Sequence, residues 1–514
     1  MFEEMRKLAE KYHAGQMRDG DEGIPYIEHP RAVVQNLLVW GEERESPAVL
    51  MAWGHDLLED TAVSDAELLA ASDETVLKGI RRLTKDKNTP KSLYLRSVAR
   101  SGDRDVLLVK ISDRIQNSRD FARGKGPLRA FRYLHDADCI FEAGKDLPQD
   151  PVLARALEAW RELDEALRAP ARRDAIRGCL LGGAAGDALG APVEFMSEKK
   201  IRRQYGENGV TTFVEFPDGT GSITDDTQMT LFTAEGILRA HARKKEKGSC
   251  DFVAVMRSAY RRWLKTQGGR VPENTPEEVL DSGWLIREKQ LFSWRAPGNT
   301  CLSALEIPAE LEKAPNKSKG CGTVMRIAPA GLFFAPEAAY DYGCRFSALT
   351  HGHPTGITAG GAFAMLIAEL LTGKPLEEAL ELVLEHLAGK PDAAETAAAL
   401  RKAREAETVS ELGEGWIAEE ALAIGVHCAL KHPWELREGL LKAVNIDGDS
   451  DSTGAIAGNI LGVINGESAI PAEWRSRLRE KEIVSQMADD LWQRFEADEN
   501  GRATREWREK YPEA

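Results

Sequence analysis

Apolar residues recur at helical spacing through most of the chain. In ten segments they recur three or four residues apart, the pattern of a helix with one buried face. These segments are residues 8–12, 31–39, 47–58, 106–115, 178–189, 227–240, 357–371, 375–387, 418–430 and 454–462. Alternation of apolar and polar residues, which is typical of a half-buried strand, is best developed over residues 210–216. The sequence therefore predicts an all-α protein.

A change in composition near residues 165–173 predicts two domains. The helical run 151–167 is followed by RAPARR (168–173) and then by the glycine-rich, apolar segment GCLLGGAAGDALGAP. Proline is poorly tolerated inside a helix, so the basic stretch is expected to separate two helical cores. We expect a first domain over 1–168, a second over 173–485 and a C-terminal helical tail over 486–514.

Composition and charge narrow the functional classes. The 514 residues include 68 Lys and Arg against 83 Asp and Glu, a formal net charge of −15. An acidic chain disfavours a nucleic-acid-coating protein. The seven cysteines form no CxxC pair, which favours a reducing, cytoplasmic location. No apolar stretch approaches the ~18 residues that a membrane span needs, and the charged N-terminus has no apolar signal-peptide core. We expect no membrane partner.

Three motifs in the first domain carry metal-binding chemistry. They are IPYIEHP, WGHDLLEDT and VKISDRIQN, and their polar residues include His29, His55, Asp56, Glu59, Asp60, Asp113 and Asn117. Two imidazoles with two carboxylates suit a borderline divalent ion such as Mn²⁺, Fe²⁺ or Zn²⁺. A carboxylate next to such an ion can act as a general base. An isolated His-Asp pair is usually a surface or capping pair, and the combination of the three motifs favours a metal site.

These motifs, in this order over residues 1–165, resemble the HD hydrolase domain of the RelA/SpoT type. The resemblance implies one Mn²⁺ or other divalent transition metal, with His29, His55, Asp56 and Asp113 as ligands. It implies that Glu59 and Asp60 are the catalytic acids, and that Arg18 and Asn117 contact a nucleotide. The implied substrate is a 3′-pyrophosphate of the ppGpp kind or NADPH. GDEG, between Arg18 and Pro25, is longer than usual, and no synthetase domain follows.

Three motifs in the second domain combine carboxylates with hydroxyls. They are GDALGAPVEF, SITDDTQMT and NIDGDSDSTGAIAGNILG, with Asp187, Glu194, Thr224, Asp225, Asp226, Asp449, Asp451 and Ser452. Hard oxygen ligands suit Mg²⁺ or Mn²⁺, and the acidic residues suffice for two ions. TDDT and DSDST each precede an apolar helical run, so they also suit helix N-caps. Both roles can coexist at a helix N-terminus.

The joint pattern from about residue 173 to residue 473 resembles the ADP-ribosylglycohydrolase family. NKSKGCGTVMRIAPAG, ALTHGHP and GEGWIAEEALAIGVHCAL match it further. The resemblance implies an all-α fold with two Mg²⁺ or Mn²⁺ ions held by Thr224, Asp225, Asp226, Asp449, Asp451 and Ser452. Asp225, Asp226 and Glu194 are the implied catalytic carboxylates; Gly320, Cys321, Gly322 and His351 are expected to contact the substrate. Many relatives have Asn at Cys321 and Thr at Ser452. Within the helix over 418–430, His427 and Cys428 are expected to be core residues.

Together, the two resemblances predict a bifunctional hydrolase. The first domain would act on a phosphorylated nucleotide, and the second domain would release ADP-ribose from a modified protein side chain or small molecule. Nucleic acid is expected as a partner only when it is itself ADP-ribosylated. Two alternatives remain: the first domain could be a non-catalytic nucleotide sensor, or both domains could process one ADP-ribose-containing metabolite or nucleic-acid end. A purely structural role, as in lens relatives that lose the metal carboxylates, is disfavoured because this chain keeps all four.

Overall fold

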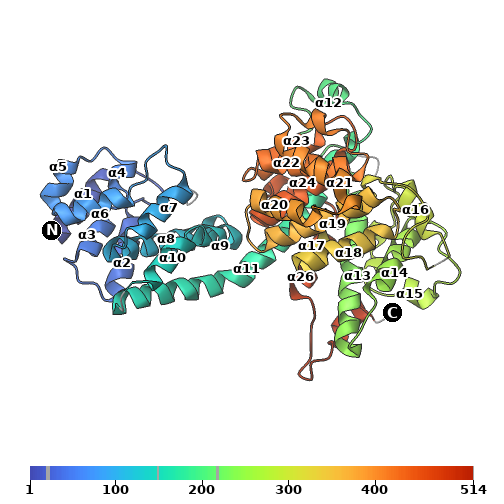
Figure 1. Ribbon diagram of the computed structural model, residues 1–514, viewed down its shortest axis with the longest axis horizontal. Coiled ribbons are helices and arrows are strands. Elements are labelled where there is room, and N and C mark those ends of the chain that lie inside the picture. The colour runs from blue at the N-terminus through green and yellow to red at the C-terminus, as the bar shows by residue number, and fades with distance from the viewer. Residues whose placement is uncertain (19–22, 148–149, 216–218, 309, 513–514) are drawn as a thin grey trace. The chain divides into compact units, whose positions relative to one another are not determined.

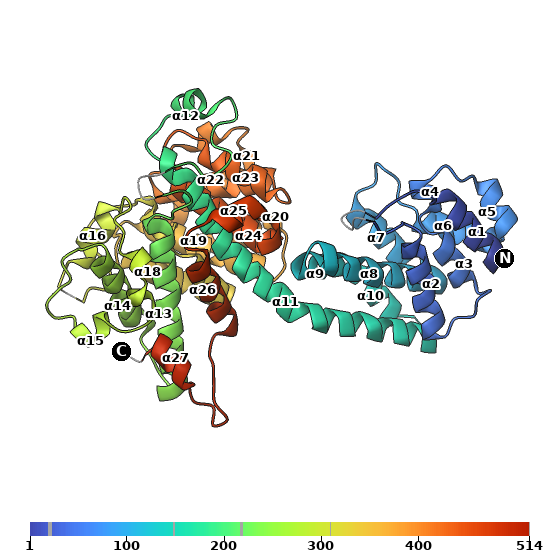
Figure 2. The ribbon, with the colours of Figure 1, turned by 180° about the vertical axis from the view of Figure 1, so that it is seen from behind.

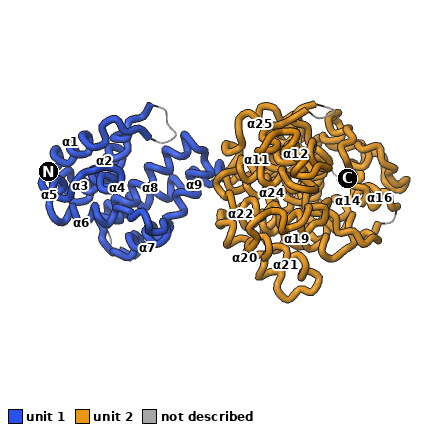
Figure 3. The backbone as a smooth tube through the Cα atoms, turned by 90° about the horizontal axis from the view of Figure 1, so that it is seen from above, with its two compact units in different colours: residues 1–171 blue, residues 172–514 orange. Residues whose placement is uncertain are grey.

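A computed structural model describes residues 1–18, 23–147, 150–215, 219–308 and 310–512 of the chain (Figure 1). The chain divides into two compact units, Met1–Ala171 and Arg172–Ala514 (Figure 3). Both are helical, and the described residues contain no strand, only three isolated β-bridges. The predicted all-α class is confirmed. The best strand candidate of the sequence, 210–216, forms no strand over residues 210–215, which are irregular, and residue 216 lies outside the described part.

Unit 1 builds its core around one long helix, α8. Its helices are α1 (Phe2–Tyr12), α2 (Glu28–Trp40), α3 (Pro47–Gly54), α4 (Leu57–Asp60), α5 (Asp65–Ala71), α6 (Glu74–Leu83), α7 (Lys91–Arg100), α8 (Arg104–Gly124), α9 (Pro127–His135) and α10 (Asp138–Lys145). Helices α2, α3, α6, α9 and α10 all pack against α8. Because α8 is covered on several sides, residues 106–109 and 111–115 are buried, and this run carries Asp113 into the interior.

Helix α11 (Pro151–Gly190) continues through Pro170, across the stretch 168–173 that was expected to separate two domains, and the two units divide within this stretch, after Ala171. A proline inside a helix removes one hydrogen bond and costs about 3 kcal/mol. Packing at both ends offsets this cost. Leu153 and Trp160 lie in the core of unit 1, whereas Ile176 and Leu180 are buried in unit 2. Each half of the helix is therefore fixed by its own core.

Unit 2 has a core of helices that are buried over most of their length, among them α13, α14, α19, α22 and α24. Its helices after α11 are α12 (Glu198–Tyr205), α13 (Asp225–Lys247), α14 (Phe252–Thr266), α15 (Glu277–Leu280), α16 (Asn299–Leu305), α17 (Ala328–Phe333), α18 (Pro336–Ala348), α19 (Pro354–Leu371), α20 (Leu376–Leu387), α21 (Ala394–Glu405), α22 (Ala418–Lys431), α23 (Leu436–Val444), α24 (Ser450–Asn465), α25 (Ala472–Arg477), α26 (Lys481–Gln493) and α27 (Arg505–Lys510). By length and composition, α19 could cross a membrane, but 83% of it is buried inside the protein, as in a core helix.

Glycines bring α11 and α24 into direct backbone contact. Gly182 faces the backbone of Gly458, and Gly186 faces that of Gly454, so a Cβ at any of these positions would clash with main-chain atoms of the other helix. Glycines four residues apart lie on one face of a helix. This seam places the N-terminus of α24 beside the C-terminal turns of α11, which carry Asp187.

The residues expected to form a separate tail pack within unit 2 (Figure 2). Helix α26 contacts α13, and the chain then returns along α13 through α27. Trp507 and Tyr511 are buried, and Arg239 of α13 donates a hydrogen bond from Nε to the carbonyl of Pro512. Residues 486–512 therefore belong to unit 2, and Trp507 and Tyr511 lie in its core.

Candidate metal centres in the two units

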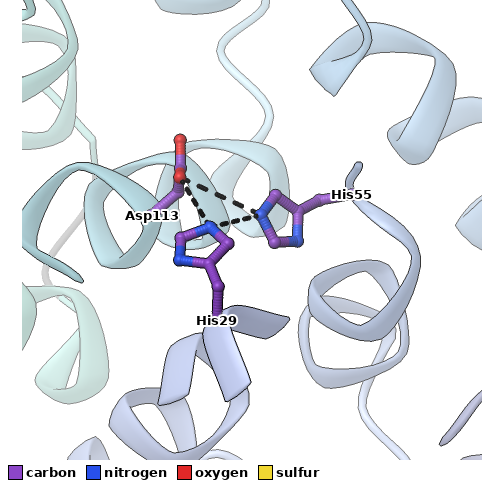
Figure 4. A group of neighbouring side chains, drawn as sticks. All are labelled: His29, His55 and Asp113. Carbon is purple, nitrogen blue, oxygen red and sulfur yellow. Dashed lines mark hydrogen bonds and ion pairs between the residues drawn. The ribbon is translucent and has the colours of Figure 1, made fainter. Parts of the chain in front are cut away.

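In unit 1, three helical segments bring imidazole and carboxylate groups to one point. His29 lies in the first turn of α2, His55 follows the last residue of α3, and Asp113 lies in the middle of α8 (Figure 4). The Nε2 atoms of His29 and His55 are 3.3 Å apart, and His29 Nε2 is 3.3 Å from Asp113 Oδ1. Asp56 Oδ2 lies 3.1 Å from His55 Nε2. The structure therefore brings together all four residues implied as ligands.

The hydrogen bonds of this His–Asp cluster suit a bound cation. The Nδ1 atom of His55 is 2.7 Å from the carbonyl of Ala52, which accepts its proton and leaves Nε2 with a lone pair toward the cluster. Two imidazole lone pairs 3.3 Å apart repel unless a proton or metal ion lies between them. Burial alone lowers the pKa of His55, but the carboxylates of Asp56 and Asp113 outweigh it and raise the pKa to about 9. In metal-free protein a proton therefore compensates the carboxylates, and the donor set fits a borderline divalent metal.

The other residues predicted for this site surround the cluster. Asn117 donates to Asp113 Oδ1 at 2.5 Å, and Arg18 donates to Asn117 Oδ1 at 2.7 Å. Glu59 and Asp60 are exposed, one turn after Asp56, and Glu59 accepts the backbone N–H of Lys85 at 2.9 Å. A substrate could therefore reach Glu59 and Asp60 from solvent.

A group of cations, Lys91, Lys110 and Arg114, lies beside the cluster, and the sequence motifs gave these residues no role. The Lys91 Nζ and Arg114 Cζ atoms lie 4.7 and 4.2 Å from the centre of the Tyr133 ring, and Asn117 donates to the Tyr133 hydroxyl at 3.4 Å. Lys110 pairs with Asp113 Oδ2 at 2.9 Å. Positive charges next to the cluster favour an anionic ligand such as a phosphate. Lys110 and Arg114 lie in the motif VKISDRIQN of α8 but were given no role there, whereas Lys91 and Tyr133 come from α7 and α9, outside the quoted motifs.

In unit 2, two helix N-termini meet with their acidic side chains. Thr224 is the N-cap of α13 and accepts the N–H of Asp226 at 3.3 Å; Asp449 is the N-cap of α24 and accepts the N–H of Ser452 at 3.3 Å. Capping and clustering therefore coexist here. Asp225, Asp226, Asp449 and Asp451 are each at most 4% exposed. We call these four residues the acid cluster.

Asp187, in the last turns of α11, fixes the start of α13. Its carboxylate accepts the N–H of Thr224 at 2.9 Å, the N–H of Thr227 at 3.1 Å and the Thr227 hydroxyl at 2.5 Å. The sequence indicated Asp187 only as part of a motif and gave it no role. Its function is visible only in the fold, because its partners lie about forty residues away.

The acid cluster lacks compensating protein charge. Among the described residues no Lys or Arg forms an ion pair with any of its four members, and Asp226 Oδ2 is buried without a hydrogen-bond partner. Burial and the charge of Asp451 raise the pKa of Asp225, Asp226 and Glu194, in the last case to about 10. Such a set of hard oxygen donors fits Mg²⁺ or Mn²⁺, whose charge would remove the repulsion.

Metal-free unit 2 is expected to lose stability as the pH rises. Burial and Asp451 raise the pKa of Asp187 to about 7, whereas an unfolded Asp titrates near 3.9. The folded state thus retains a proton that the unfolded state releases, so this contribution is complete below about pH 4 and is lost as the pH rises through about 7. In calorimetry with chelator, the unit 2 transition should fall from pH 5.5 to pH 8, and saturating Mg²⁺ or Mn²⁺ should restore it. An equal or higher melting temperature at pH 8 without metal would contradict this expectation.

Glu194 approaches the acid cluster from a loop. One carboxylate oxygen each of Glu194, Asp449 and Asp451 lies within 4.8 Å of the others. The next residue, Phe195, is 74% exposed and stacks on Trp416, with ring centroids 5.6 Å apart and planes at 18°. Unlike the buried aspartates, Glu194 is half-buried and adjoins solvent.

The residues of unit 2 that were expected to contact the substrate lie close together, around a turn at Cys321. Cys321 begins a 3₁₀ turn, and its N–H donates to the carbonyl of Trp416 at 3.1 Å. A Cβ on Gly320 or Gly322 would lie 3.3 or 3.1 Å from the ring of His351. Burial and the nearby Arg326 lower the pKa of His351 to about 3, so its ring is neutral. Burial and the negative charges of Asp449 and Asp226 raise the pKa of the Cys321 thiol.

Similarity to known proteins covers both units. Over 332 residues the chain is 27% identical to the ADP-ribosyl-[dinitrogen reductase] glycohydrolase of Rhodospirillum rubrum, covering 62% of this chain and 96% of that protein. It is 25% identical over 332 residues to the ADP-ribosylarginine hydrolase Tri1 of Pseudomonas putida (strain GB-1), covering 62% and 78%. A further 126 residues are 32% identical to the guanosine-3′,5′-bis(diphosphate) 3′-pyrophosphohydrolase MESH1 of Danio rerio, covering 24% and 69%.

The family described as ADP-ribosylglycohydrolase matches residues 168–501, which include the acid cluster, Glu194 and the turn at Cys321. This match is about two thirds of the chain and extends past the boundary expected at residue 485. The family resemblance of the second domain is thereby confirmed. The chain belongs to the ADP-ribosylglycohydrolase family.

Proposed function

We propose that unit 2 releases ADP-ribose from a modified side chain, with two Mg²⁺ or Mn²⁺ ions bound at the acid cluster. The observation that carries this proposal is the buried acid cluster at two helix N-termini, with which no Lys or Arg of the described part of the chain forms an ion pair. Thr224, Asp225, Asp226, Asp449, Asp451 and Ser452 would hold the ions. When bound, the ions would neutralise these carboxylates and polarise the hydroxyls of the ribose.

Glu194 is the residue that we assign to proton transfer. It is half-buried on a loop, whereas the four aspartates are buried at helix ends. A glycosidic bond breaks through an oxocarbenium-like state, in which a carboxyl group protonates the leaving group or activates water. Burial and the acid cluster raise the pKa of Glu194 to about 10, which keeps a proton on it in metal-free protein.

The surroundings of Glu194 favour a cationic leaving group. The exposed rings of Phe195 and Trp416 lie next to it, and the Glu414 carboxylate accepts the indole N–H of Trp416 at 3.1 Å. Aromatic faces beside carboxylates suit a guanidinium ion. The names of the two glycohydrolase relatives refer to ADP-ribosylated dinitrogen reductase and ADP-ribosylarginine. We therefore propose arginine-linked ADP-ribose as the preferred substrate.

A substrate panel tests this assignment. Full-length protein with Mg²⁺ or Mn²⁺ should release ADP-ribose from ADP-ribosylarginine at least about tenfold faster, in kcat/KM, than from ADP-ribosylserine or an ADP-ribosylated nucleic-acid end. A preference for serine or nucleic acid would overturn the arginine assignment. No release from any of the three would overturn the proposed activity of unit 2.

For unit 1, we propose an HD-type phosphohydrolase that uses Mn²⁺ or another divalent transition metal. His29, His55, Asp56 and Asp113 would hold the ion, which would lower the pKa of a bound water. Glu59 and Asp60 would assist proton transfer, and the cations near Tyr133 would bind phosphate groups of the substrate. The candidate substrates are a ppGpp-like 3′-pyrophosphate and NADPH. Retention of Glu59 and Asp60 favours turnover over nucleotide sensing.

The cysteines support a reducing compartment for this protein. All seven are free thiols, and Cys179, Cys301 and Cys428 are buried. We therefore propose a cytoplasmic location.

A further inference from the structure

Tyr26, to which the sequence patterns gave no role, links the metal-ligand group of unit 1 to its acidic pair. It lies three residues before His29, and its hydroxyl oxygen is 2.8 Å from Asp56 Oδ2 and 2.8 Å from Asp60 Oδ2. Asp56 belongs to the His–Asp cluster, whereas Asp60 is one of the two proposed catalytic acids. The Tyr26 hydroxyl thus lies between the carboxylate of an implied metal ligand, Asp56, and the carboxylate of a proposed catalytic acid, Asp60.

The ring of Tyr26 is held from behind by a buried histidine. The His13 ring is stacked on it, with centroids 4.7 Å apart and planes at 26°, and His13 is 1% exposed. His13 Nδ1 lies 2.7 Å from Gln16 Oε1, and Gln16 donates from Nε2 to the backbone carbonyl of Asp60 at 3.2 Å. Tyr26 and Gln16 therefore hold Asp60 twice, through its side chain and through its main chain.

Asp60 depends on this support because its own helix is short. Helix α4 has four residues, and Asp60 is the last of them and is exposed. Among the described residues, Tyr26 is the hydrogen-bond partner of the Asp60 carboxylate. The neighbouring Glu59 is held separately by the N–H of Lys85. Loss of the Tyr26 hydroxyl would therefore free Asp60 and leave Glu59 in place.

We infer that Tyr26 is a positioning residue whose hydroxyl orients Asp60 toward the His–Asp cluster. This inference rests on the proposed phosphohydrolase function of unit 1. A reacting group that moves by about 1 Å can lose about 100-fold in rate, even when substrate and metal still bind. The hydroxyl of Tyr26 thus acts on the rate of the chemical step through Asp60.

Tyr26→Phe in the full-length, Mn²⁺-loaded protein tests the inference, with ppGpp and NADPH as substrates. The change should lower kcat about 10- to 100-fold and leave KM within about twofold of wild type. Mn²⁺ affinity, measured by calorimetry in an Asp451→Asn background so that unit 1 supplies the signal, should also stay within about twofold. Tyr12→Phe is the matched control: it removes a tyrosine hydroxyl that donates to Glu67 at 2.6 Å, away from the cluster. It should keep wild-type kcat.

A double variant distinguishes positioning from general support. If Tyr26 acts through Asp60, Tyr26→Phe combined with Asp60→Asn should be no slower than Asp60→Asn alone. Wild-type kcat in Tyr26→Phe, additive losses in the double variant, or an equal loss of Mn²⁺ affinity would each overturn the inference. If wild-type protein hydrolyses neither nucleotide, the proposed function of unit 1 fails and this inference fails with it.

Discussion

Asp451→Asn is expected to abolish ADP-ribose release while making metal-free unit 2 more stable. The Asp451 charge raises the pKa of Asp225, Asp226 and Asp449, so it repels each of the other three members of the acid cluster. An amide removes that charge with almost no change in shape, and its oxygen can still accept the N–H of Ser452, now at 2.9 Å from Asp451 Oδ1. The variant should therefore fold normally.

The expected effects of Asp451→Asn have opposite signs in two measurements. The rate of ADP-ribose release should fall by about 1000-fold or more, because the metal ligands are incomplete. At pH 8 with chelator, the melting temperature of unit 2 should rise by roughly 2 °C or more, since like charges no longer repel. Wild-type protein should be further stabilised by Mn²⁺, whereas the variant should respond little.

Glu438→Gln is the matched control for this experiment. Glu438 is an exposed carboxylate on α23, outside the acid cluster, so its loss should change neither the rate nor the response to Mn²⁺. Full activity in Asp451→Asn would contradict the role of the acid cluster. A lower melting temperature in chelator would contradict the view that its carboxylates repel one another in the metal-free state.

The parts of both sites that are local in sequence could be predicted, and their partners could not. Asp225 and Asp449 stand within short acidic motifs that precede apolar helices, so their placement at helix N-termini follows from the chain itself. Asp187 and Tyr26 act on residues about thirty to forty positions away. Only the packing of helices brings such pairs together, and no spacing rule identifies them.

Pro170 and His427 show how tertiary packing changes the interpretation of single residues. Pro170 lies in the stretch that was expected to separate two cores, yet α11 continues through it because each end is buried in its own core. His427 is buried at 3% exposure, as expected for a core residue, and its Nδ1 lies 2.9 Å from the carbonyl of Ala403. It also borders a cavity of 1170 Å³ next to α23, which the helical pattern alone could not indicate.

His55→Ala should abolish nucleotide hydrolysis by unit 1 and leave ADP-ribose release by unit 2 unchanged. The Nε2 atom of His55 lies 3.9 Å from the buried Asp113 carboxylate and 3.1 Å from the Asp56 carboxylate. Removing the imidazole takes this nitrogen away from both carboxylates, and the ion loses a ligand. Removing one ligand of a borderline metal should lower the rate by about 1000-fold or more under limiting Mn²⁺. Phosphate or pyrophosphate release from ppGpp and NADPH measures this loss.

His135→Ala is the control within unit 1. His135 is partly exposed and pairs with Asp138 and Asp164, so it carries a similar imidazole outside the cluster. Its replacement should leave both activities within about twofold of wild type. Two separate metal centres require that Asp451→Asn and His55→Ala each abolish one activity only, because neither side chain contributes to the other cluster. Equal loss of both activities in either variant would contradict independent centres and favour the view that both units process one substrate.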